Sequence, residues 1–96
     1  MLKITHTILD GNCGDLSKSE IKEYGEAVNK AIKTAYPDAN VSTEIKWNTS
    51  GIGGGMDVRE SDGVYEVAPG EGEHDCEAIE AHCWDIADKC LETAGA

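Results

Sequence analysis

The sequence predicts an α+β fold, a two-layer sandwich in which two helices cover one face of a mostly antiparallel sheet of three to four strands. Two segments with helical periodicity, 17–36 and 73–94, are separated by short runs that alternate as half-buried strands do. The expected order is strand, helix, three strands, helix. Packing both helices on one sheet face buries both apolar stripes. A length of 96 residues and 40% hydrophobic content predict a single domain spanning 1–96.

The first strand is predicted at 2–9 and is followed by a loop at 10–15. One face of this strand carries Leu2, Ile4, His6 and Ile8. His6 therefore points to the apolar side of the sheet. We expect it to be a core histidine with satisfied hydrogen bonds rather than a metal ligand.

The first helix is predicted over 17–36. Ser17 and Glu20 have the spacing of a capping box, and Leu16 and Ile21 occupy the positions of a hydrophobic staple. Pro37 ends the helix, because a proline pushes the preceding residue out of the helical region. The buried stripe is expected to contain Ile21, Tyr24, Gly25, Val28, Ile32 and Ala35.

A glycine-rich stretch follows the second strand, which is predicted at 41–47. A phosphate-binding loop would lead into a helix and carry a lysine, whereas SGIGGG leads into the strand-like run MDVRE. We therefore expect a mobile hairpin loop between the second and third strands, with Ile52 as an adaptable contact for a partner. Asp62-Gly63 predicts a tight hairpin between the third and fourth strands.

Three cysteines of the second helix, Cys76, Cys83 and Cys90, are seven residues apart. Seven helical residues rise about 10.5 Å, so these thiols cannot share one zinc ion. Their spacing matches a core stripe with Ile79, Ile86 and Ala87. The fourth, Cys13, lies between Asp10 and Asp15, whose charges should raise its pKa and make it a poor nucleophile.

Charge is distributed unevenly along the chain. The net charge is −11, with 7 acids and 6 bases in residues 1–56 but 12 acids and 2 bases in residues 57–96. Such a field repels nucleic acid and anionic membranes and attracts basic protein surfaces. It excludes direct nucleic-acid and membrane binding as expected functions. The amino terminus has no apolar signal segment, so a cytoplasmic location is expected.

A second stripe on the helix at 73–94 places an aromatic side chain among carboxylates. Trp84 is expected at the boundary of the core or exposed, where tryptophan often acts as a binding hot spot. The hairpin acids Glu60, Glu66 and Glu71, together with Asp75, would extend this patch. The predicted partner-binding residues are Ile52, Glu66, Glu73, Glu77, Glu80, Trp84, Asp88 and Leu91.

In size, in the acidity of 57–96 and in its lack of a catalytic motif, the chain resembles small phage-encoded inhibitors, including anti-CRISPR and DNA-mimic proteins. The resemblance implies a non-enzymatic protein that blocks nucleic-acid-binding machinery by occupying its basic groove. The expected partner is then a basic nucleic-acid-binding protein or complex in the host cytosol. The sequence predicts no cofactor, metal or catalytic residue.

Two alternatives stay open at the sequence level. One is a homo-oligomeric structural or regulatory module, for example a homodimer, with Trp84 and Leu91 in the subunit interface. The other is a small enzyme or metal-binding domain, for example with a zinc site that includes His74 and Cys76.

Overall fold

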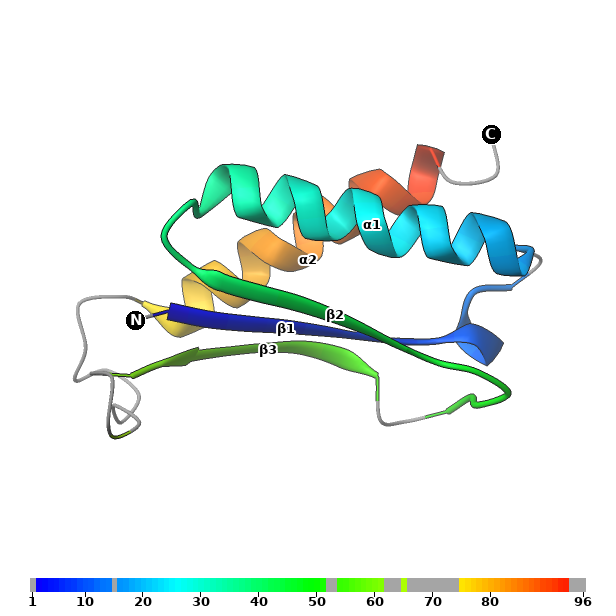
Figure 1. The fold of residues 1–96 in the computed structure, drawn as a ribbon, viewed down its shortest axis with the longest axis horizontal. Helices are drawn as coiled ribbons and strands as arrows, with labels where there is room; N and C mark the ends of the chain where they lie inside the picture. Colours follow the sequence, from blue (N-terminus) through cyan, green and yellow to red (C-terminus); the bar gives the residue numbers. More distant parts are fainter. Residues whose placement is uncertain (1, 15, 52–53, 62–64, 66–74, 94–96) are drawn as a thin grey trace.

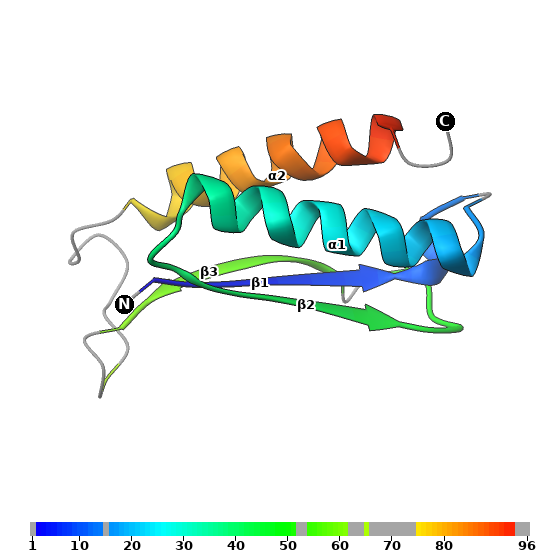
Figure 2. The ribbon, with the colours of Figure 1, turned by 45° about the horizontal axis from the view of Figure 1, so that its top comes forward.

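The structure is a computed structural model. It describes residues 2–14, 16–51, 54–61, 65 and 75–93. Its elements are β1 (Leu2–Leu9), the 3-10 turn η1 (Asp10–Asn12), α1 (Lys18–Ala35), β2 (Asn40–Lys46), β3 (Gly55–Glu60) and α2 (Cys76–Thr93). Both helices lie on the same side of the sheet (Figures 1 and 2). The predicted α+β sandwich is therefore confirmed, with three strands in the part of the chain that is described.

The sheet is mixed rather than mostly antiparallel. Its strand order is β2-β1-β3, with β1 parallel to β2 and antiparallel to β3. Helix α1 carries the chain back to the end of the sheet where β1 began, so β2 must run in the same direction as β1. The central strand is thus the amino-terminal one.

The connection between β2 and β3 is not a hairpin loop, because β1 lies between these strands. The connection crosses the carboxyl end of β1, and its first part is hydrogen-bonded to η1. The Thr49 amide donates to Asp10 Oδ1 at 2.9 Å, and the Gly11 amide donates to the Thr49 carbonyl at 2.9 Å. Asn12 and Gly51 exchange two hydrogen bonds of 2.8 and 3.0 Å. Four bonds therefore hold the two loops together at one end of the sheet.

Helix α1 begins as the sequence predicts. Ser17 Oγ accepts from the Glu20 amide, and Glu20 Oε1 accepts from the Ser17 amide, so the capping box is complete. Tyr36 caps the carboxyl end, directly before Pro37. The Tyr36 hydroxyl shares a 2.6 Å hydrogen bond with His82 Nδ1, which ties the end of α1 to α2.

Helix α2 begins at Cys76, three residues later than predicted. Asp75 Oδ1 accepts from the Ala78 amide at 3.1 Å, as an N-cap does, which explains the later start. The predicted cysteine stripe is confirmed, because Cys83 is fully buried and Cys76 and Cys90 pack against the core. The core between the sheet and the helices consists of Leu2, Ile4, Ile8, Ile21, Tyr24, Val28, Ile32, Val41, Met56, Cys83 and Ala87.

The predicted Asp62-Gly63 hairpin and fourth strand lie largely outside the described residues. At their border, Ser61 Oγ donates to the Tyr65 carbonyl at 3.2 Å, and the Tyr65 side chain is exposed. Arg59 donates from Nε to Asp57 Oδ2 on its own strand at 2.7 Å.

Candidate functional site

The solvent-facing side of α2 is strongly acidic. The helix contains five acids and one base, Lys89, which pairs with Asp85 at 3.3 Å. We call the five carboxylates the α2 acidic face; its members are Glu77, Glu80, Asp85, Asp88 and Glu92. Four of them are exposed and Glu80 is half-buried. The folded chain thus presents a ridge of negative charge along one whole helix.

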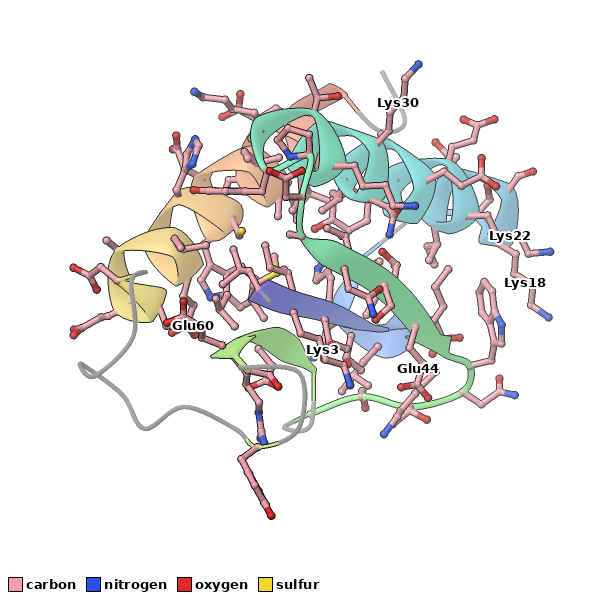
Figure 3. The ribbon with its side chains drawn as sticks, turned by 60° about the vertical axis from the view of Figure 1, so that its left-hand side comes forward. Lys3, Lys18, Lys22, Lys30, Glu44 and Glu60 are labelled. Atoms are coloured by element: carbon pink, nitrogen blue, oxygen red, sulfur yellow. The ribbon has the colours of Figure 1, made fainter. Side chains whose placement is uncertain are left out.

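Basic side chains project from other parts of the molecule. Lys18 and Lys22 extend from α1 on the side away from α2, and Lys3 extends from the face of the sheet opposite the helices (Figure 3). The charge asymmetry of the sequence therefore becomes an asymmetry between surfaces.

Two large apolar side chains lie beside the acidic carboxylates, as predicted. Trp84 is 39% exposed and Leu91 is 42% exposed. Three predicted site residues, Ile52, Glu66 and Glu73, lie outside the described residues.

The predicted extension of the patch to Glu60 is wrong. Glu60 is only 8% exposed, because it shares the core-facing side of β3 with Met56 and Val58. Its carboxylate belongs to the interior beside Cys76, whose pKa is raised by burial and, secondarily, by Glu60.

A cavity of about 250 Å³ lies beside Trp84 and Leu91, between α2, α1 and the carboxyl end of β1. In Figures 1 and 2 the second half of α2 lies farther from the sheet than the first half. We call this space the α2 cavity; it is lined by His6, Thr7, Ile8, Leu9, Asn12, Cys13, Tyr24, Gly54, Gly55, Trp84, Asp88 and Leu91. It connects the α2 acidic face to the interior.

Three aromatic rings from three different elements meet at this cavity. His6 of β1 lies between Tyr24 of α1, at a centroid distance of 5.9 Å, and Trp84 of α2, at 6.3 Å. Both contacts are edge-to-face, with interplanar angles of 84° and 82°. This geometry is a favourable one for aromatic pairs.

His6 is buried as predicted, but the expectation that its hydrogen bonds are satisfied is wrong. It is 2% exposed, and its Nδ1 has no hydrogen-bond partner among the described residues. Burial lowers the pKa of His6 to about 4, so the imidazole is neutral at pH 7. A buried polar atom without a partner is uncommon and marks a place where a ligand or water can bond.

Tyr24 and Cys13 are both protonated at neutral pH. Burial raises the pKa of Tyr24 to about 12, with smaller contributions from Cys13, Cys90 and Asp88. Burial also raises the pKa of Cys13, and Asp10 adds to the effect as predicted from the sequence. The Cys13 thiol donates to the Leu9 carbonyl at a distance of 3.5 Å. A thiol in this state is a poor nucleophile.

A second hollow of about 450 Å³ runs between α1 and the edge strand β2. Asn29 Nδ2 donates to Thr43 Oγ1 across it at 3.0 Å, so these two polar groups already satisfy each other. Lys22 and Glu26, which have opposite charges, also line it. This hollow therefore lacks the unpartnered group that distinguishes the α2 cavity.

No cluster of three metal-ligating side chains occurs among the residues that the structure describes. Neither α1 nor α2 is apolar enough over its length to cross a bilayer, and no other described segment is a helix that could.

Comparison with known proteins gives no match to a protein family, to a curated protein or to a solved structure.

The sequence predicted Trp84, Asp88 and Leu91 as site residues, but not His6 and Tyr24. Helical spacing groups the first three on one side of α2. Only the fold brings β1 and α1 to the same place. The available signal was a histidine within an otherwise apolar strand face, next to a helix whose tryptophan borders its core stripe.

Proposed function

We propose that this protein is a non-enzymatic binding protein that uses the α2 acidic face to occupy a basic protein surface and block nucleic-acid binding there. The observation that carries the proposal is the ridge of carboxylates along α2 with Trp84 and Leu91 exposed beside it. Acidic side chains would accelerate the encounter with a basic partner, and the apolar pair would supply contact area.

Helix stability does not account for this arrangement of acids. Asp88 and Glu92 lie in the carboxyl-terminal part of α2, where the helix dipole favours cations, and the last turn has no base. Like charges at a spacing of three or four residues, such as Glu77 with Glu80, add a small further cost. A surface kept at a cost to stability is consistent with a binding role.

The experiment is capture of basic proteins from a host lysate on the immobilised chain, followed by work with the purified partner. We expect a nucleic-acid-binding protein whose affinity for this chain falls steeply with increasing salt, because the Debye length shrinks from about 30 Å at 0.01 M to about 8 Å at 0.15 M ionic strength. We also expect the chain and the partner's nucleic acid to displace each other.

Two outcomes would contradict the proposal. One is a partner that binds this chain and its nucleic acid simultaneously. The other is association that is insensitive to salt and occurs between copies of the chain itself, as expected if Trp84 and Leu91 form a homodimer interface. Sedimentation of the purified chain at low and high salt separates the second outcome from the first.

A further inference from the structure

We propose that the α2 cavity binds the cationic head of a basic side chain, an arginine guanidinium or a lysine ammonium. This inference rests on the proposed function, since the side chain would be presented by the partner that the α2 acidic face engages. The cavity would then act as the pocket for one anchoring residue within a larger interface.

The charge of the lining selects a cation. Asp88 contributes a carboxylate to the cavity, and no lysine or arginine is among the described residues that line it. The remaining acids of α2 lie on the same helix. A phosphate or carboxylate ligand would meet only like charge here, whereas a guanidinium would gain a charge-assisted hydrogen bond to Asp88.

The aromatic rings supply a second attraction. Trp84 and Tyr24 both line the cavity, and Trp84 keeps 39% of its surface exposed. A cation over the face of such a ring is stabilised by the ring quadrupole, most strongly for tryptophan. The rings and Asp88 come from two helices that face the same cavity, so one head group can contact both.

His6 supplies an unpartnered hydrogen-bonding group. A neutral imidazole has one nitrogen that accepts, and a guanidinium or an ammonium has several N–H donors. Because burial lowers the pKa of His6 to about 4, the ring carries no charge at pH 7 and does not repel a cation. Nδ1 has no protein partner but also less than 1 Å² of exposed surface, so a cation can bond to it only where the ring or its neighbours shift.

The size of the cavity favours a side chain over a cofactor. Its volume of about 250 Å³ lies just below the range of roughly 300–1,000 Å³ for small-molecule and cofactor sites. Its walls beyond the polar groups are aliphatic, with Ile8, Leu9 and Leu91, which suits the methylene stem of arginine or lysine.

The test is a titration that needs no partner protein. A Trp47→Phe variant leaves Trp84 as the only tryptophan, so its fluorescence reports on the cavity. N-acetyl-arginine amide and N-acetyl-lysine amide are the cationic probes, and N-acetyl-citrulline amide is the neutral counterpart of the arginine probe. We expect a saturable change with the cations, a basic peptide binding more tightly than either, and at least tenfold weaker binding of citrulline.

Three variants in the Trp47→Phe background test whether the effect comes from this site. Asp88→Asn should weaken arginine binding about tenfold, because it removes the charge and leaves the shape. Asp38→Asn, the same change at an exposed position in the turn after α1, should leave binding unchanged. A Leu91→Phe variant, which fills the mouth of the cavity without adding a second tryptophan, should abolish binding and so distinguishes the cavity from a general attraction of cations.

Equal binding of arginine and citrulline, no saturable change with any probe, or full affinity in Asp88→Asn would overturn the inference. None of these results would contradict the proposed function. That function is tested by the salt dependence of partner binding and by competition between this chain and the partner's nucleic acid. Conversely, if no basic partner is found but arginine still binds in a way that depends on Asp88, the inference about the cavity stands and the proposed function is rejected.

Discussion

His6 lies at the meeting point of three elements, with a ring from each helix packed edge-to-face against it. Protonation would place a charge in this buried position. The pKa of His6 is about 4 in the folded chain against 6.5 for an unperturbed histidine, so the unfolded chain takes up the proton first as pH falls. Stability is therefore full above pH 6.5 and declines as pH drops from 6.5 toward 4.

We predict that the free energy of unfolding falls by about 2 kcal/mol between pH 7 and pH 5 because of this one residue. The measurement is urea unfolding at both values. His6→Leu should remove most of this loss, because it removes the group that takes up the proton. An unchanged pH dependence in His6→Leu would show that His6 is not responsible.

For a single residue, the sequence predicts whether the side chain faces the core or the solvent, but it predicts less well which other side chains it contacts. Alternation in β1 placed His6 in the core, and the structure confirms this position. Alternation could not reveal that Nδ1 lacks a hydrogen-bond partner, because the rings that pack around His6 come from α1 and α2, in other parts of the chain. Glu60 is the converse case, since its charge indicated the surface while its place in β3 puts it inside.

Helix α2 has acids at both of its ends, and the helix dipole has opposite effects on a negative charge at the two ends. Carboxylates such as Glu77 in the first turn are stabilised by the dipole, and those such as Glu92 in the last turn are destabilised.

The same substitution should therefore have opposite effects at the two ends of α2. Glu92→Lys should raise the free energy of unfolding by about 0.3–1 kcal/mol, and Glu77→Lys should lower it by a similar amount. Thermal or urea unfolding at low salt measures both. Equal shifts in one direction would mean that the total charge of the chain, rather than its position along the helix, controls stability.

The junction of η1 with the loop after β2 depends on a glycine. A Cβ at Gly11 would lie 2.4 Å from Ser50 Cβ and 2.8 Å from the Thr49 carbonyl oxygen, which is too close for either atom.

Gly11→Ala should destabilise the fold by about 1–3 kcal/mol, the usual cost of overpacking. Adding Ser50→Gly removes one of the two clashes and should restore part of the loss, as measured by urea unfolding. A stable Gly11→Ala protein would show that the two loops separate without cost.

Elements were predictable where their signals are local. The capping box fixed the start of α1, and Pro37 fixed its end. Strand pairing was not predictable, because the sequence of β2 reads the same whether it pairs with β1 or β3. The prediction of a hairpin across the glycines was wrong for this reason. Strand β2 pairs in parallel with β1, so β1 lies between β2 and β3.

Across the whole molecule, most of the net charge of −11 comes from residues 57–96. Folding places the described acids of α2 on one ridge, while Lys18 and Lys22 of α1 point elsewhere (Figure 3). The composition predicted the sign of this surface, and helical spacing predicted its main members. The α2 cavity could not be predicted in this way, because the residues that line it, from His6 to Leu91, are as many as 85 positions apart in the sequence.

The proposed function depends on where the negative charge lies on the molecule rather than on its amount. Two double variants with the same net charge separate these properties: Glu77→Lys with Glu80→Lys on α2, and Glu23→Lys with Asp38→Lys at exposed positions elsewhere. Circular dichroism should first show that both remain folded.

The deciding measurement is the affinity of each double variant for the purified basic partner at low salt. We predict that reversal on α2 weakens binding by at least a hundredfold, while reversal elsewhere weakens it by less than tenfold. Equal losses in the two variants, or full affinity after reversal on α2, would contradict the claim that this helix is the binding surface.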